Sequence, residues 1–83
     1  MNDPEPEAEP ETVIAATFDC RGQRCPLPII ALAHQIGSVE IGAVVALLAD
    51  DPAARSDVPA WCSMRGQTYL GESEPGRFLI RRT

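Results

Sequence analysis

Lysine is absent from this sequence, and all seven cationic side chains are arginines. The chain therefore cannot form a lysine Schiff base or a phosphate-binding loop of the Walker type. Long apolar stretches are missing as well, because the longest, residues 43–49, is far shorter than the roughly 20 residues that cross a bilayer. The first residues are neither basic nor apolar, so we expect no secretory signal, no membrane partner and a cytoplasmic location.

Cysteine and histidine are scarce, with cysteines at positions 20, 25 and 62 and a single histidine, His34. So few cysteines, in an odd number, cannot make a disulfide scaffold. No compact pair of these residues has the ligand spacing of a zinc site, so we expect no metal ion and no cofactor. In a reducing compartment the cysteines should remain free thiols unless one of them takes part in chemistry.

Negative charge is concentrated at the start of the chain. Five of the 12 acidic residues, and no basic residue, lie within residues 1–12, where they alternate with proline. Such a segment cannot bury enough apolar surface to offset the entropy of ordering it, so we predict a disordered acidic tail. The other seven acidic residues are balanced by seven arginines, and residues 13–83 suffice for one small domain. Without an excess of positive charge, this domain is not expected to bind nucleic acid directly.

The pattern of residues beyond the tail alternates between segments typical of strands and of helices. The expected order is strand, helix, strand, helix, strand, strand, at residues 13–19, 26–36, 43–49, 52–65, 67–72 and 77–82. We expect the second helix in two parts, with a first turn at 52–55 and a restart near 57, because Pro59 should interrupt it. Helical crossovers between parallel strands, followed by a hairpin at Pro75-Gly76, predict an α+β fold. This βαβαββ order gives a two-layer α/β sandwich with a four-stranded mixed sheet and two helices.

The first predicted helix has apolar residues on two faces. One stripe has the spacing of a core-facing surface and consists of Ile29, Leu32, Ala33 and Ile36. The opposite face presents Leu27, Ile30, Ala31 and His34. A contiguous apolar row beside a reactive group is suited to binding a partner, so we predict a docking surface at Leu27, Ile30 and His34. On the second helix, Val58, Trp61, Cys62 and Arg65 share the spacing of one helix face, which places Trp61 and Cys62 toward the core.

Cys25 is the strongest candidate for chemistry. It stands directly before Pro26-Leu27-Pro28, at the expected N-cap of the first helix. The prolines should leave the sulfur at an exposed corner, and Arg21 and Arg24 are close in sequence. A helix N-terminus and nearby cations lower the pKa of a thiol. The sequence therefore predicts a nucleophilic thiolate at Cys25, although a cysteine that only caps the helix is an alternative.

The Cys25-Pro26-Leu27-Pro28 motif, preceded by Asp19-Cys20-Arg21-Gly22, resembles the Cys-Pro-x-Pro signature of the TusA/SirA sulfur-carrier family. The resemblance continues in order through Ala49-Asp50-Asp51-Pro52-Ala53, Asp57-Val58-Pro59-Ala60-Trp61-Cys62 and Phe78-Leu79-Ile80-Arg81. Members of this family have the two-layer fold derived above. The resemblance implies that Cys25 accepts sulfane sulfur as a persulfide from a cysteine desulfurase or a rhodanese. The carrier then passes the sulfur to a downstream acceptor protein.

One departure from the family concerns the docking surface. Leu27 stands where the better-known members that serve tRNA thiolation have an acidic residue, and the helix after it is less basic than theirs. The pathway therefore stays open between tRNA thiolation, cofactor synthesis, sulfur oxidation and selenium handling.

Other residues near Cys25 have two interpretations each. Cys20 could be a second thiol that resolves the persulfide or pairs with Cys25, or a small residue that fills space in a strand. Asp50 and Asp51 follow the second strand, and parallel pairing of the first two strands places them at the same sheet edge as Cys25. They could pair with Arg21 or Arg24 or help to move a proton, and Asp51 could serve as an N-cap. Two other functions are open: a thiol redox switch using Cys20 and Cys25, and a noncatalytic protein-binding adaptor.

Overall fold

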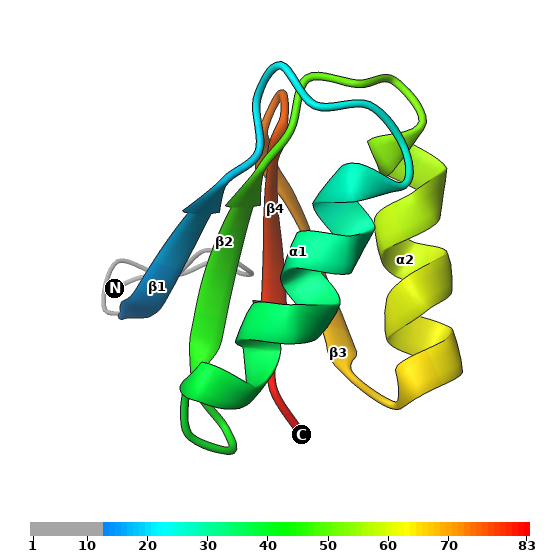
Figure 1. Ribbon diagram of the computed structural model, residues 1–83. Helices are drawn as coiled ribbons and strands as arrows, with labels where there is room; N and C mark the ends of the chain where they lie inside the picture. Colours follow the sequence, from blue (N-terminus) through cyan, green and yellow to red (C-terminus); the bar gives the residue numbers. More distant parts are fainter. Residues whose placement is uncertain (1–12) are drawn as a thin grey trace, which may run out of the picture.

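The computed structural model describes residues 13–83, so the acidic tail predicted at residues 1–12 lies outside the described part of the chain. Within residues 13–83, the strands form one mixed sheet in the order β1-β2-β4-β3, and the two α-helices lie on one face of it (Figure 1). The elements are β1 (Ile14–Asp19), α1 (Leu27–Gln35), β2 (Val44–Leu48), α2 (Ala54–Arg65), β3 (Thr68–Glu74) and β4 (Arg77–Arg81). This order confirms the predicted βαβαββ sandwich. None of the described helices has the length and apolar character needed to cross a membrane.

Strand β2 is central because both of its faces are apolar. It pairs in parallel with β1 and antiparallel with β4. Alternate side chains of β2 contribute to two clusters, with Val45 and Leu47 beneath the helices and Val44 and Ala46 on the other face. The larger cluster, which includes Phe78 of β4, is the main hydrophobic core of the described residues.

Helix α1 begins at Leu27 with Pro26 as its N-cap, so the prediction that Cys25 is the N-cap is wrong by one residue. After Gln35 the chain tightens into one 3₁₀ turn, Ile36–Ser38. Leu32 and Ile36 of the predicted inner stripe are buried, while Ile29 and Ala33 pack against the core from its edge. Ala31, predicted on the outer face, also packs partly against the core. Ala31 reaches the core because successive residues of an α-helix are rotated by about 100°, so a residue between the two faces can contact the core from the side.

Helix α2 is continuous from Ala54 to Arg65, and Pro59 lies inside it. The predicted break at Pro59 is therefore wrong. Proline removes one helical hydrogen bond, but Val58 and Trp61 on either side of it are buried against the sheet. Their burial keeps both halves of the helix in line. Trp61 and Cys62 are buried, as predicted. Arg65, which shares their spacing, is exposed in the last turn before Gly66, whose φ of 73° ends the helix.

The hairpin between β3 and β4 turns at Pro75-Gly76, as predicted. Gly76 has a φ of 83°, and a Cβ at this position would come within 2.8 Å of the carbonyl oxygen of Ala49. The backbone N–H of Ala49 donates a 2.9 Å hydrogen bond to the carbonyl oxygen of Gly76. The turn is thereby fixed against the end of β2, at the same end of the sheet as the segment between β2 and α2 (Figure 1).

Candidate functional site

The segment between β1 and α1 meets the segment between β2 and α2 at one end of the sheet (Figure 1). Two hydrogen bonds join them. The backbone N–H of Gly22 donates to Oδ1 of Asp50 at 2.9 Å, and the backbone N–H of Cys25 donates to Oδ2 of Asp51 at 2.7 Å. The prediction that these loops share an edge is confirmed, and both aspartates hold the backbone of the cysteine loop in place.

Asp51 also connects this loop to the start of α2. Its Oδ1 accepts a 3.1 Å hydrogen bond from the backbone N–H of Ala53, which is the N-cap residue of the helix. The bonds from the N–H groups of Cys25 and Ala53 lower the pKa of the Asp51 carboxyl. Both oxygens of this carboxylate thus have a positioning task, although the N-cap of α2 is Ala53, two residues after the position predicted for it.

The Cys25 side chain is exposed in a shallow depression between the two helices, which we call the thiol slot. Its lining residues are Cys25, Pro28, Ile29, Asp51, Ala54 and Asp57. Hydrogen bonding to the Asp57 side chain is the first cause that raises the pKa of the Cys25 thiol, followed by desolvation and the negative charges of Asp57 and Asp51. The predicted lowering of this pKa is therefore wrong.

The arginines near Cys25 in sequence explain the difference. Arg21 is engaged by Asp19, with Nε at 2.9 Å from Oδ1 and Nη2 at 2.7 Å from Oδ2. This two-point pair lowers the pKa of Asp19 to about 2. Arg24 is exposed, and its charge makes a small contribution to the lowered pKa of Asp51. Carboxylates, and not the guanidinium of Arg21, are thus the charged groups that shift the pKa of the Cys25 sulfur.

The two other cysteines are buried free thiols. Cys20 is 3% exposed, and burial together with the negative charge of Asp19 raises its pKa. Cys62 is 1% exposed, and burial raises the pKa of its thiol to about 11. Cys25 is therefore the thiol that an incoming protein can reach.

Asp57 is the residue at this site that sequence reasoning missed. The expected interruption at Pro59 placed Asp57 at the start of a separate helix, with no relation to Cys25. In the continuous helix it lies in the first turn, where its backbone N–H donates to the carbonyl oxygen of Ala53 at 2.9 Å. The available signal was an acidic residue, Asp57, two positions before Pro59. Its proximity to Cys25 could not be predicted, because it depends on how α1 and α2 pack.

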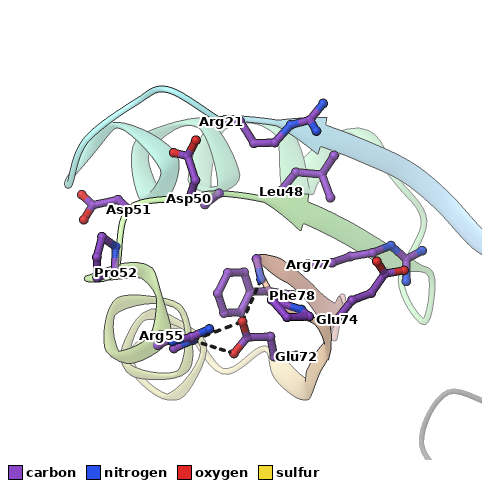
Figure 2. A pocket seen from close by; sticks show the side chains of 13 residues that line it. Arg21, Leu48, Asp50, Asp51, Pro52, Arg55, Glu72, Glu74, Arg77 and Phe78 are labelled. Atoms are coloured by element: carbon purple, nitrogen blue, oxygen red, sulfur yellow. Dashed lines mark hydrogen bonds and ion pairs between the residues drawn. The ribbon is translucent and has the colours of Figure 1, made fainter.

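A larger hollow of about 580 Å³ lies beside the thiol slot, between the start of α2 and the β3–β4 hairpin (Figure 2). Arg55 reaches across it to Glu72, with Nε at 3.1 Å from Oε1. Oε2 of Glu72 also accepts a 2.8 Å hydrogen bond from the backbone N–H of Gly76, and these contacts lower its pKa. Cys25 is not among the residues that line this hollow.

The predicted docking residues lie on the solvent side of α1. Leu27 is 50% exposed and Ile30 is 46% exposed, and His34 is exposed one turn further along. Leu27 is two residues from Cys25 in sequence, so the apolar row begins next to the thiol slot. Pro26 is exposed at the N-cap, whereas Pro28 is buried and forms part of the slot.

Comparison with known proteins identifies the family. The family model described as sulfurtransferase TusA matches residues 16–82. The chain belongs to the TusA family. A sulfur carrier protein TusA from Pseudomonas entomophila (strain L48) is 36% identical over 59 residues, which cover 71% of this chain and 74% of that protein. The family membership and the fold expected from the Cys-Pro-x-Pro resemblance are both confirmed.

A solved structure supports the same assignment. The crystal structure of a SirA-like protein from Desulfitobacterium hafniense superposes with a TM-score of 0.60 at 29% sequence identity. The match covers 78% of this chain and 90% of that one. The TusA family match includes the thiol slot, both helices, strands β2 to β4 and residues 16–19 of β1.

Proposed function

We propose that this protein is a sulfur carrier that holds sulfane sulfur as a persulfide on Cys25. The observation that carries the proposal is the contrast between one exposed thiol, Cys25, and two thiols enclosed in the core. Membership of the TusA family supports the same function. A cytoplasmic location fits, because a carrier of this kind needs a reducing compartment in which its cysteine returns to the free thiol.

The chemistry is a transfer between sulfur atoms. The Cys25 sulfur attacks the outer sulfur of a persulfide on the donor, and a new S–S bond forms as the donor S–S bond breaks. The donor cysteine leaves with the electron pair as a thiolate. Delivery repeats the same step, with Cys25 now the leaving group and a cysteine of the acceptor as nucleophile. Each transfer exchanges one S–S bond for another, so no external oxidant or reductant is consumed.

The donor in this proposal is a cysteine desulfurase or a rhodanese, and the recipient is a downstream sulfur-acceptor protein. Partner cysteines must come within bonding distance of an exposed sulfur, so the partner surface has to cover the thiol slot. Leu27, Ile30 and His34 offer an exposed and mostly apolar surface that starts beside it. We assign the docking function to this row, and assign to Asp50, Asp51 and Pro28 the task of holding the cysteine loop in shape.

The function is tested by incubating the full chain with a cysteine desulfurase and cysteine, or with a rhodanese and thiosulfate. Peptide mass spectrometry should find one added sulfur atom, about 32 Da, on the peptide that contains Cys25. Iodoacetamide treatment before loading should remove the signal, because Cys25 is the exposed thiol. Sulfur found only on Cys20 or Cys62 with several competent donors would overturn the assignment.

The docking surface is tested by the double substitution Leu27→Ser and Ile30→Ser. Central apolar residues of an interface contribute about 1 to 2 kcal/mol each, so transfer from a donor protein should slow by roughly tenfold or more. Both side chains are about half exposed, so folding and iodoacetamide alkylation of Cys25 should stay unchanged.

The matched control is Met64→Ser, which removes an apolar side chain that is 75% exposed at the far end of α2. This variant should transfer sulfur at the wild-type rate. A double variant that also transfers at the wild-type rate would exclude the row as the docking site.

A further inference from the structure

The carboxylate of Asp57 lies in the thiol slot but does not support the cysteine loop. Asp50 accepts the N–H of Gly22, and Asp51 accepts the N–H groups of Cys25 and Ala53. Asp57 is partly buried and lines the slot together with Cys25, opposite the first turn of α1. Neither of the ion pairs formed by residues 13–83 includes the Asp57 side chain.

The position of Asp57 is set by helix α2. It lies in the first turn of α2, where its backbone N–H is bonded to the carbonyl oxygen of Ala53. Ala54, Pro28 and Ile29 form the apolar walls of the slot around it. A carboxylate held among apolar side chains, beside a single thiol, is placed to exchange a proton with that thiol. Structural support of the cysteine loop does not require it, because Asp51 already provides that support.

We propose that Asp57 is the proton relay of the carrier, accepting the proton of Cys25 when sulfur is loaded and protonating the Cys25 sulfur when sulfur is delivered. This inference rests on the proposed persulfide function. During loading, the Cys25 S–H bond breaks as the sulfur attacks the donor persulfide, and the Asp57 carboxylate takes the proton. The proton then passes to the donor thiolate that has left. During delivery the acceptor thiol gives its proton to the Asp57 carboxylate as its sulfur attacks the outer sulfur, and Asp57 passes that proton to the Cys25 sulfur as it leaves.

This role has a consequence for the resting protein. The same carboxylate favours the protonated form of the free thiol, since it raises the pKa of Cys25. The thiolate is the reactive form, so the free carrier should react slowly with solvent electrophiles. Removing the carboxylate should therefore slow sulfur delivery and speed alkylation of the free thiol. General damage to the site would not change these two rates in opposite directions.

The experiment compares the full-length wild type with Asp57→Asn, Asp57→Ser and Asp57→Glu. The control is Glu40→Gln, which removes the same charge at an exposed residue before β2 that does not line the thiol slot. Each protein is loaded with sodium tetrasulfide, and loading is verified by the mass increase at Cys25. Delivery is then measured as the single-turnover loss of that sulfur to N-acetylcysteine. Iodoacetamide alkylation of the unloaded proteins is measured between pH 6 and pH 10.

We expect Asp57→Asn and Asp57→Ser to deliver sulfur roughly 100-fold more slowly, which is the lower range for loss of a general acid or base. Both variants should be alkylated about twofold or more faster at pH 7, with the alkylation pH profile moved to lower pH. Asp57→Glu should restore much of the delivery rate, and Glu40→Gln should behave as wild type in both assays.

Delivery at the wild-type rate by both uncharged variants, or delivery and alkylation that change in the same direction, would overturn the relay. Should one uncharged variant fail to fold, the other still decides between these outcomes. Absence of added sulfur on wild-type Cys25 would instead refute the persulfide function, and the relay with it. Failure of the relay and failure of the function therefore give different results.

Discussion

Replacing Cys25 with serine is expected to abolish sulfur loading completely. A serine hydroxyl is a much weaker nucleophile than a thiol and cannot form the persulfide, while its size and polarity leave the loop intact. The hydrogen bond to Asp51 is donated by the backbone N–H of residue 25, so it should survive the substitution. Mass spectrometry after incubation with a sulfur donor should find no added sulfur on any peptide, and circular dichroism should show an unchanged fold.

Cys20→Ala is the matched control, and it separates a carrier from a thiol redox switch. Cys20 is buried, and its pKa is raised by burial, so it should not take part in transfer. The alanine variant should load sulfur on Cys25 at close to the wild-type rate, with a modest loss of stability from the removed sulfur atom. Loss of function in this variant would favour the redox switch. Full function in Cys25→Ser would favour a noncatalytic adaptor.

The largest loss of stability is expected for Leu32→Ala. Leu32 is fully buried, and it joins helix α1 to the main core between the helices and the sheet. Leucine-to-alanine substitutions at such positions reduce the free energy of unfolding by about 3 to 5 kcal/mol, because the transfer energy is lost and a cavity is left. Small domains have total stabilities of about 5 to 15 kcal/mol, so a large fraction of this variant should be unfolded by mild denaturant.

Urea denaturation measures this effect, and Ile30→Ala is its control on the same helix. Ile30 is 46% exposed, so its truncation should reduce the free energy of unfolding by less than about 1 kcal/mol. The slope of the free energy against urea concentration should be the same in both variants. A loss below about 1 kcal/mol for Leu32→Ala would mean that α1 is not held to the sheet by this side chain.

Periodicity was enough to predict the strands and the helix faces, because burial follows the repeat of each element. The run at residues 43–49 is apolar on both faces, and it became the central strand β2, Val44–Leu48. The prediction failed at Pro59, where a local rule about proline competed with a tertiary effect. Val58 and Trp61 are buried on either side of that proline, and no local property of the sequence indicates how strongly they hold the helix straight.

Part of the candidate site could be predicted in the same way. The motif at Cys25 and the parallel pairing of β1 with β2 were sufficient to bring the cysteine loop to Asp50 and Asp51. The direction of the thiol pKa could not be predicted, because proximity in sequence does not determine which charge faces the sulfur. Arg21 pairs with Asp19 instead. Asp57, which raises the pKa, is 32 positions from Cys25 and approaches it only through the packing of α1 on α2.

The position of β4 has a consequence for how the protein is made. Strand β4 is the last strand in chain order, yet it lies between β2 and β3 in the sheet. A nascent chain that has not yet released residues 77–81 from the ribosome lacks the antiparallel partner of both strands. The hairpin turn that fixes the end of β2 is missing at that stage too. The cysteine loop therefore acquires its final shape only after β4 has left the ribosome and paired with β2, so Cys25 should become competent for loading at that point and in one cooperative step.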